Sequence, residues 1–386
     1  MSDLTAAADA AQRALDAVPA GSDDRPGYLA MLAVCRWDWY DATGSLADLD
    51  RALVTAEEAV SGLAPDSALW ARLHSNLGML YLVRYERMGA VGDLDRAIEL
   101  VGVGVETVRA GDVERPGFYA NLASALMVRF EWQIGRRGDP LPQGEIDLDD
   151  LHAAISLYGL ALSEPDHGLV DRALILSNMG DALLDRAAMH RLVDEDDKAE
   201  TVYSQALAAH TEAVEVTPRT APDLAGRLNK LAVVQRSQAD RTSAQKDADA
   251  ARASFRQACE TGLAAAPEMA LAAAVNWVAW EVARRSWPEV VAGDGYALRA
   301  AEALNRSQQL RAHRETWLLV SRGLVAEGAY AAVQSGDLLG AVVRMERGRA
   351  ILLADDLDMV PTALGRLSDD DLARRYTAAA RRLQSL

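Results

Sequence analysis

Apolar residues recur along the chain at the spacing of an amphipathic helix. From about Asp66 to Arg87 they fall three or four positions apart, as Leu69, Leu73, Leu77, Leu80 and Tyr81. Residues spaced in this way lie on one face of an α-helix, where they can pack against a neighbour. Met88-Gly89 follows, and glycine is common just beyond a helix C-terminus. The pattern predicts a helix that ends near Arg87.

A second apolar stretch follows directly. Asp93 has a side chain that can cap a helix N-terminus, and the apolar positions after it are Leu94, Ala97, Ile98, Val101 and Val105. β-Branched runs are few in the chain, whereas Ala, Leu, Glu and Arg, which favour helices, are abundant. The sequence therefore predicts a pair of amphipathic helices joined by a polar turn.

This two-helix unit repeats with a period of 45 residues. Leu49-Asp50-Arg51-Ala52 returns as Leu94-Asp95-Arg96-Ala97, and Arg25-Pro26-Gly27 returns two periods later as Arg115-Pro116-Gly117. One apolar position can be followed through six pairs: Leu32, Leu77, Leu122, Met179, Leu231 and Trp277. A seventh pair is predicted from about Gln308 to Ala354. A fixed period of this size is typical of stacked repeats, in which each pair packs on its neighbours.

Two of the steps between pairs are longer than the period. The 57-residue step from Leu122 to Met179 contains Gly135–Gly144, which is rich in glycine and proline and is predicted to be a loop insertion. The 52-residue step that follows contains the acidic run Asp194–Asp197. We expect this run to lie at the start of a helix, in solvent.

The segment Asn76-Leu77-Gly78-x-x-Tyr81, with Ala97 in the partner helix, resembles the tetratricopeptide repeat (TPR). The usual period of that repeat is about 34 residues, so the helices here would be longer by whole turns. The resemblance implies an all-α, right-handed, TPR-like superhelical solenoid of about seven helix pairs. We expect residues 1–22 to form an N-terminal capping helix, residues 23–354 the solenoid, and residues 355–386 a C-terminal linker and helix.

The C-terminal third resembles a narrower family. Residues 345–353 read Met-Glu-Arg-Gly-Arg-Ala-Ile-Leu-Leu, similar to the closing helix of actinobacterial TPR proteins that carry a CHAT domain, a caspase-like peptidase fold. Residues 367–386 resemble the helix that leads into that domain. The catalytic His and Cys of the family would lie beyond Leu386, and Cys35 and Cys259 match no such motif. The resemblance implies a sensing or scaffold portion that regulates a CHAT-type protease, linked or separate.

Charge and composition narrow the class of partner. The net charge is −17, which argues against nucleic acid or an anionic membrane as partner, since phosphate binding needs clustered positive charge. The acidity leaves two alternatives open, a role in solubility alone or a basic partner. The two cysteines form no disulfide framework or metal-binding spacing. No basic and apolar leader starts the sequence, and no apolar run approaches about 20 residues, so we expect a cytoplasmic protein.

Two rows of polar residues are the candidate binding site. The residue before the aligned apolar position is an asparagine in four pairs and a lysine in a fifth: Asn76, Asn121, Asn178, Lys230 and Asn276. A side-chain amide both donates and accepts hydrogen bonds, so it can bind a peptide backbone without reading its sequence. The row resembles the asparagine ladder of peptide-binding TPR proteins, whose first helices line a concave groove. The alternative is that each amide hydrogen-bonds the backbone of the neighbouring repeat.

The second row lies eight residues further along each first helix: Arg84, Arg129, Arg186 and Arg284. Eight residues correspond to a rotation of about 80° from the asparagine. An arginine row could bind carboxylates of a partner through paired hydrogen bonds. The alternative is local pairing with Glu86, Glu131 or Asp185, which would contribute about 0–1 kcal/mol for each pair.

An enzyme is poorly supported. Asp355-Asp356-Leu357-Asp358 and Asp369-Asp370-Asp371 are the nearest match to the magnesium-binding aspartates of a helical terpene cyclase, and both stand near the C-terminus. Neither a His-Glu-x-x-His zinc motif nor a phosphate-binding loop is present. We therefore expect no catalysis, cofactor or metal, and a protein or peptide as partner. A stand-alone adaptor that bridges two proteins is the alternative to a CHAT-linked sensor.

Overall fold

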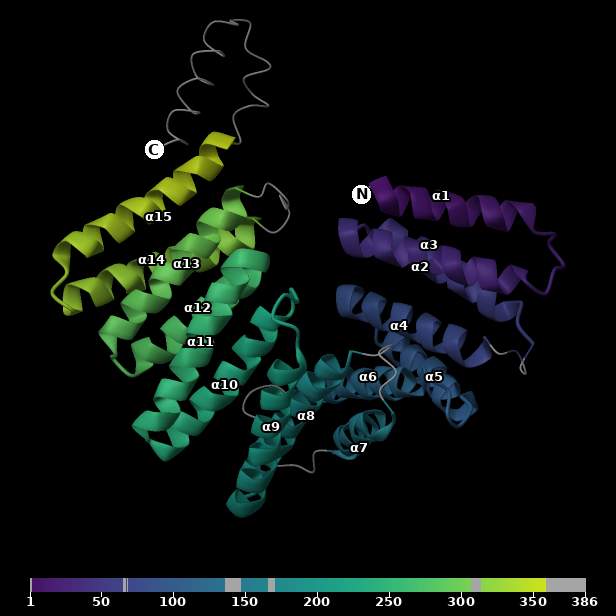
Figure 1. Cartoon of the computed structure of the whole chain (residues 1–386), viewed down its shortest axis with the longest axis horizontal. Coiled ribbons are helices and arrows are strands. Elements are labelled where there is room, and N and C mark those ends of the chain that lie inside the picture. The colour runs from purple at the N-terminus through teal and green to yellow at the C-terminus, as the bar shows by residue number, and fades with distance from the viewer. Residues whose placement is uncertain are drawn as a thin grey trace, which may run out of the picture. The chain divides into compact units, whose positions relative to one another are not determined.

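The computed structural model describes residues 2–64, 67, 69–135, 147–165, 171–306 and 314–358. In these residues the chain forms fifteen α-helices and no strand (Figure 1). Their bounds are α1 Ser2–Ala17, α2 Arg25–Thr43, α3 Leu46–Ser61, α4 Trp70–Met88, α5 Val91–Thr107, α6 Arg115–Gly135, α7 Asp149–Ser163, α8 Arg172–Leu192, α9 Asp196–Val216, α10 Leu224–Thr242, α11 Gln245–Ala265, α12 Pro267–Ala283, α13 Trp287–Arg306, α14 Arg314–Gln334 and α15 Leu338–Asp358. The all-α fold is confirmed.

The helices pair as the 45-residue pattern predicts. After α1, which packs on α2, each even-numbered helix is the first helix of a pair and the next odd-numbered helix is its partner, from α2–α3 to α14–α15. The α8–α9 pair is joined by His210 of α9, whose ring covers Gly180 and contacts Asp181 of α8. This gives seven pairs in the described residues, and the helical-repeat class of the fold is confirmed. The chain divides into two compact units, residues 1–213 (unit 1) and 214–386 (unit 2). Most of the predicted 355–386 segment lies outside the described residues, and the predicted boundaries stay predictions.

The helix ends follow backbone conformation more closely than side-chain capping. Gly44 and Gly89, one period apart, follow α2 and α4 with φ of 68° and 70°, a left-handed conformation that glycine adopts without strain. Asp93 is not the N-cap that the sequence suggested, because α5 begins at Val91 and Asp93 lies in its first turn. The preceding helix, α4, begins at Trp70 rather than near residue 66.

Small residues let the two helices of a pair approach closely. A Cβ atom on Gly78 of α4 would lie 2.5 Å from the Val101 side chain and 2.9 Å from the Ala97 carbonyl oxygen. Gly180 of α8 is covered in the same way by the ring of His210, which would lie 2.6 Å from an added Cβ. Gly78 and Gly180 each follow the aligned apolar residue of their helix. Close packing between the paired helices requires a small residue at this position.

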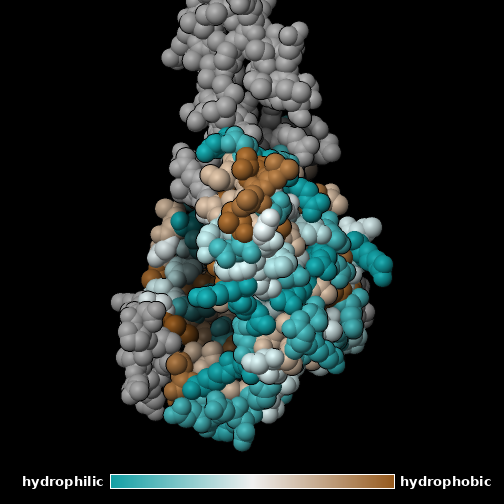
Figure 2. Space-filling model, turned by 90° about the vertical axis from the view of Figure 1, so that its left-hand side faces the viewer, coloured by the Kyte–Doolittle hydropathy of each residue, from teal (hydrophilic) through white to brown (hydrophobic). Residues whose placement is uncertain are grey.

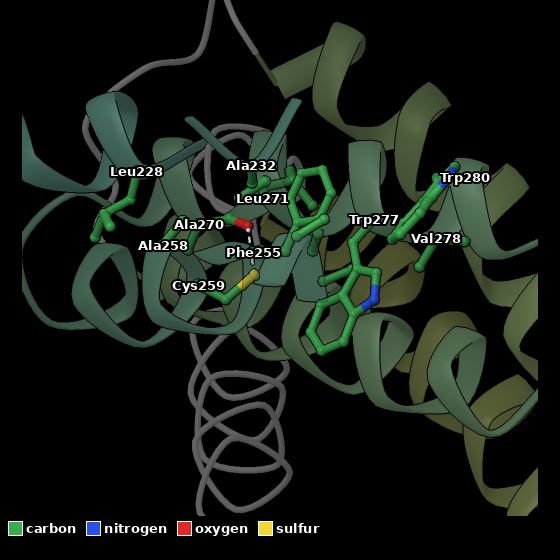
Figure 3. Close-up of a cluster of buried hydrophobic side chains, with 14 of the residues drawn as sticks. Leu228, Ala232, Phe255, Ala258, Cys259, Ala270, Leu271, Trp277, Val278 and Trp280 are labelled. Carbon is green, nitrogen blue, oxygen red and sulfur yellow. Dashed lines mark hydrogen bonds between the residues drawn. The ribbon is translucent and has the colours of Figure 1, made fainter. Parts of the chain in front are cut away.

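Each unit has its own apolar core. In unit 1, Leu49, Leu94 and Leu151 occupy one repeat position on α3, α5 and α7 and are almost completely buried. In unit 2, Trp277 is fully buried and its ring stacks on Phe255 at a centroid distance of 6.4 Å (Figure 3). The thiol of Cys259 lies in the same cluster, 3.7 Å from the Ala270 carbonyl oxygen. Burial raises the pKa of this thiol to about 12, so it is a packing residue.

The last described helix carries apolar residues in solvent. On α15, five large apolar side chains are 44–76% exposed: Leu338, Leu339, Val342, Val343 and Met345. Figure 2 looks at the side of the molecule that α15 occupies in Figure 1 and shows an apolar patch among mostly hydrophilic side chains. A face of this kind on the last pair has the composition of a surface that packs on a further element.

The structure tests the predictions for the two long steps in the repeat to different extents. Helix α9 begins at Asp196, with Asp196 and Asp197 in its first turn, so the acidic run does mark a helix start, as expected. The predicted loop insertion, Gly135–Gly144, lies outside the described residues except for Gly135, the last residue of α6.

Candidate functional site

The structure describes all members of the asparagine row. Asn76, Asn121 and Asn178 lie on α4, α6 and α8 of unit 1, and Lys230 and Asn276 lie on α10 and α12 of unit 2, each partly exposed. The row is thus divided between the two units, with three members in the first. Contact of these residues with a ligand stays a prediction.

Three of the amides hydrogen-bond side chains of neighbouring helices. Asn121 Nδ2 donates to Ser75 Oγ on α4 at 3.1 Å. Asn276 Nδ2 donates to Asn229 Oδ1 on α10 at 3.2 Å. In each case the bond joins the first helices of two successive pairs.

Asn178 hydrogen-bonds the hydroxyl group of Tyr158 on α7. This hydroxyl also lies 3.0 Å from the Ser124 hydroxyl oxygen on α6. Tyr158 is almost fully buried, and burial raises its pKa to about 12. The phenol therefore stays neutral and ties α6, α7 and α8 together.

The arginine row points toward the second helices. Arg84 donates two hydrogen bonds of 2.7 Å to Asp93 on α5, and Arg129 donates two of 2.7 Å to Asp150 on α7. These are local pairs, but the carboxylates are those at the start of the partner helix rather than Glu86, Glu131 or Asp185. Hydrogen bonding to the aspartates raises the pKa of both guanidinium groups.

The other two arginines differ from this pattern. Arg284 contacts Asp240 on α10 at 3.3 Å and lies over the ring of Trp280. Arg186 has a buried Nε atom with no hydrogen-bond partner in the described residues. The row is therefore not a uniform binding surface, because only two of its members share one geometry.

The open surface of the first helices in unit 1 is acidic. The line of partly exposed residues that starts at Asn76 continues along α4 through Met79, Val83 and Glu86, and the equivalent lines on α2, α6 and α8 are also partly exposed. We name this surface the acidic face; its sixteen positions are Met31, Val34, Asp38, Asp41, Asn76, Met79, Val83, Glu86, Asn121, Ser124, Val128, Glu131, Asn178, Asp181, Asp185 and Ala188. Six of these residues are carboxylates and none is basic.

The carboxylates of the acidic face influence one another. Burial and the nearby charges of Asp181 and Glu86 raise the pKa of Glu131. Burial raises the pKa of Asp185 to about 6, with further contributions from Glu131 and Asp181. Within the described residues, neither Glu131 nor Asp185 makes a salt bridge. Carboxylates without a salt bridge thus lie on α6 and α8.

The sequence contained a signal for this face that the two predicted rows missed. Asp41, Glu86 and Glu131 stand one period apart, each after an aromatic residue. This recurrence marks the repeat, but it also places three carboxylates in one column on successive first helices. The exposed column could have been recognised because an acidic side chain at a fixed repeat position must point away from the core.

In the described part of the chain, no cluster of three or more His, Cys, Asp or Glu residues has a metal-binding arrangement. Asp369–Asp371 lie outside the described residues, and Asp355–Asp358 end α15. No described helix is both long enough and apolar enough to cross a bilayer.

The motif that resembles CHAT-associated proteins makes contacts within unit 2. It lies on α15, where Arg347 pairs with Glu302 of α13 at 2.6 Å. A Cβ atom on Gly348 would lie 2.5 Å from the side chain of Val325 on α14. Packing of α15 against its neighbours therefore explains both the arginine and the glycine of this motif.

Comparisons with known proteins show similarity at the level of helical repeats. No protein-family model matches the chain, and no curated protein matches it. Among solved structures, the assembly chaperone of RpL4 (Acl4, residues 1–338) is 17% identical, with 81% of this chain and 97% of that chain covered and a TM-score of 0.43. The S. pombe nuclear import adaptor Nro1 is 13% identical, with 83% and 98% covered and a TM-score of 0.45.

A Rap protein complexed with competence and sporulation factor is also similar. It is 13% identical, with 91% of this chain and 94% of that chain covered and a TM-score of 0.45. With TM-scores below 0.5, none of these similarities assigns a function to this chain. The functional argument rests on the acidic face.

Proposed function

We propose that this chain is a non-enzymatic scaffold that binds a protein or peptide on the acidic face of unit 1. The observation that carries the proposal is the charge of that face: six carboxylates and no basic residue among sixteen partly exposed positions. Two arginines of the same first helices, Arg84 and Arg129, already bind Asp93 and Asp150. A basic segment of a partner would relieve the repulsion between the carboxylates, so the partner chemistry is cationic.

Selection from a random dodecapeptide library on the intact chain tests this proposal. We expect enriched peptides to be basic, and calorimetry should show that the affinity of the most enriched peptide falls as salt rises from about 50 to about 500 mM. The double variant Glu131→Gln, Asp185→Asn should weaken that affinity by roughly tenfold.

The matched control removes two charges elsewhere on unit 1. Glu99→Gln, Glu106→Gln changes the net charge by the same amount but alters exposed positions on α5, a second helix. We expect this variant to bind the peptide as the unaltered chain does. Enrichment of neutral or acidic peptides, or equal losses in the two double variants, would reject the acidic face as the binding surface.

A second candidate role is that of a stand-alone adaptor that bridges two proteins. The division of the chain into two compact units favours it, because the acidic face belongs to unit 1 alone. The exposed apolar residues of α15 belong to unit 2. Binding of two different partners to separately produced units would support this role.

The narrower role, regulation of a linked or separate CHAT-type protease in the cytoplasm, is proposed only on the resemblance of residues 345–353. A CHAT-type protease encoded beside this chain, or in sequence beyond residue 386, would support this role. Cleavage activity that is unchanged by addition of the chain to such a protease would contradict it.

A further inference from the structure

One asparagine of the row lacks the hydrogen bond that the others make. Asn121, Asn178 and Asn276 each bond a side chain of a preceding helix. Asn76 makes no hydrogen bond to any described residue, although it occupies the same repeat position. The residue is partly exposed, and no described residue uses its amide donor or acceptor.

The reason lies in the preceding pair, α2–α3. Asn121 bonds Ser75, and the residue one period before Ser75 is Ala30, which has no acceptor. The Asn76 amide therefore has no side-chain partner on α2.

The other kind of partner is missing as well. Asn178 bonds Tyr158, and the residue at the position of Tyr158 on α3 is Ala56. The hydroxyl of Ser124, which completes that contact on α6, is replaced on α2 by Val34. The two hydroxyl groups next to Asn178 are thus replaced by apolar side chains next to Asn76.

These small and apolar residues leave a pocket between α2 and α4. It is lined by Ala30, Ala33, Val34, Trp37, Ala56, Leu73, Asn76 and Leu80. Its volume of about 10 Å³ is room for one water-sized group, so a methyl group can enter and an aromatic ring cannot. Asn76 is the lining residue with a side-chain amide, and the indole N–H of Trp37 is the other polar side-chain group of the lining.

We propose that this pocket binds one methyl group of a small aliphatic side chain of a basic peptide, alanine or valine, while Asn76 hydrogen-bonds the peptide backbone beside it. The inference rests on the proposed function and narrows it, since it names the first anchor of a segment that binds the acidic face. An amide side chain matches a peptide group in donor and acceptor, and an apolar pocket matches a methyl group.

Charge complementarity selects a basic peptide over a neutral one. Asp38 lies one helical turn beyond Val34 on the same side of α2, and Asp41 follows one turn later. Both are exposed, and neither makes a salt bridge or a hydrogen bond to a described residue. Lysine or arginine residues next to the anchored side chain would therefore lie beside these carboxylates.

Nuclear magnetic resonance of the asparagine side chains tests the pocket. The intact chain, labelled with ¹⁵N at asparagine only, has side-chain signals from residues 76, 121, 178, 229, 276 and 305. The probe is the capped peptide acetyl-Lys-Lys-Val-Lys-Lys-amide, with matched peptides in which Val is replaced by Trp or every Lys by Glu. We expect the Val peptide to shift the Asn76 signal more than the other asparagine signals, and each matched peptide to lose most of that shift.

Two variants separate ligand contact from folding. Ala30→Ser supplies an acceptor like the one that Ser75 offers to Asn121, so the Asn76 amide should hydrogen-bond it. This variant should weaken binding of the Val peptide by about fivefold with no loss of thermal stability. Asn76→Ala should weaken the peptide by a similar factor, also without a lower melting temperature. The control Asn276→Ala, which deletes the equivalent internal hydrogen bond in unit 2, should lower the melting temperature and leave the affinity unchanged.

The outcomes distinguish this inference from the proposed function. If the Val peptide binds in a manner that Glu131→Gln, Asp185→Asn weakens, but Asn76 does not shift and Ala30→Ser has no effect, the pocket is rejected and the acidic face stands. If no lysine peptide binds at all, both are rejected. Equal binding of the Val and Trp peptides overturns the assigned side-chain size.

Discussion

Asn121 on α6 donates a hydrogen bond of 3.1 Å to Ser75 on α4, and so joins the first helices of two successive pairs. Asn276 and Asn229 form the same connection in unit 2, at 3.2 Å. The bonded residues are 46 and 47 positions apart, close to the repeat period. These bonds fix how one pair sits on the next, a role that apolar packing alone leaves less specific.

Removal of the Asn121 amide should therefore destabilise unit 1. Asn121→Ala deletes the donor and leaves the buried Ser75 hydroxyl without its partner, which should lower the free energy of unfolding by about 1 kcal/mol. Urea denaturation followed by circular dichroism measures the change. Asn76→Ala is the matched control, because that amide makes no internal hydrogen bond. Equal losses in the two variants would contradict the assignment.

The ion pair between Arg129 and Asp150 should contribute more than a surface pair. Both hydrogen bonds are 2.7 Å, and the carboxylate side chain is only 12% exposed. A double-mutant cycle with Arg129→Met and Asp150→Asn should give a coupling energy of about 1 kcal/mol. The exposed pair of Arg96 and Glu99 should give about 0.3 kcal/mol in the same experiment. A coupling energy for Arg129 and Asp150 no larger than that of the surface pair would contradict this prediction.

The sequence predicted the fold well because its pattern is local and periodic. Leu49 and Leu94 stand one 45-residue period apart, and the structure buries both of them. The predicted helix starts were less accurate. Asp93 matches the preference for an N-cap residue but lies within the first turn of α5. A preference of about 1 kcal/mol for one side chain does not decide where a helix begins when packing can decide it.

The candidate site was harder to predict, because a row in sequence does not show which way each side chain points. The asparagine and arginine rows are separated by about 80° around each helix, and this difference turns Arg84 toward Asp93 on the partner helix. Which asparagine lacks a partner depends on residues far away in the sequence, such as Ala30 and Ala56. Only the packing of successive pairs shows which residues lie beside each amide.

The stability of unit 2 should depend on pH through Asp294. This carboxyl group is fully buried on α13 and pairs with Arg344 at 2.9 Å, yet burial raises its pKa from 3.8 to about 6. The unfolded chain has the lower pKa, so the folded chain binds more protons between about pH 4 and pH 6. The ionised carboxylate therefore costs stability above pH 6, and this cost of about 2–3 kcal/mol disappears as the pH falls to 4.

Urea denaturation of unaltered and Asp294→Asn chains at several pH values measures this effect. The free energy of unfolding of the unaltered chain, relative to Asp294→Asn, should decrease as the pH rises from 4 to 7. The control is Asp223→Asn, at a side chain that is 71% exposed, and its difference from the unaltered chain should stay nearly constant over this range. A difference between the unaltered and Asp294→Asn chains that does not change with pH would mean that the buried carboxyl group ionises with its ordinary pKa.

Close packing of α4 on α5 predicts opposite effects for two glycines. A Cβ atom on Gly78 would lie 2.5 Å from Val101 and 2.9 Å from a backbone oxygen, whereas one on Gly102 would meet nothing within 4 Å. Gly78→Ala should therefore destabilise unit 1 by about 1–3 kcal/mol. Gly102→Ala should stabilise it by up to about 1 kcal/mol through helix propensity. Thermal melts of the two single variants give the signs.

The α2–α3 pair shows how the steric clash introduced by Gly78→Ala can be relieved. At the positions of Gly78 and Val101, the α2–α3 pair has Ala33 and Ala56, both buried. The space that an added methyl group needs is thus provided by a smaller residue on the partner helix. The double variant Gly78→Ala, Val101→Ala should recover part of the stability lost in Gly78→Ala, although Val101→Ala alone loses stability by opening a cavity. Additive losses would show that the backbone of α5, and not the Val101 side chain, sets the distance between the paired helices.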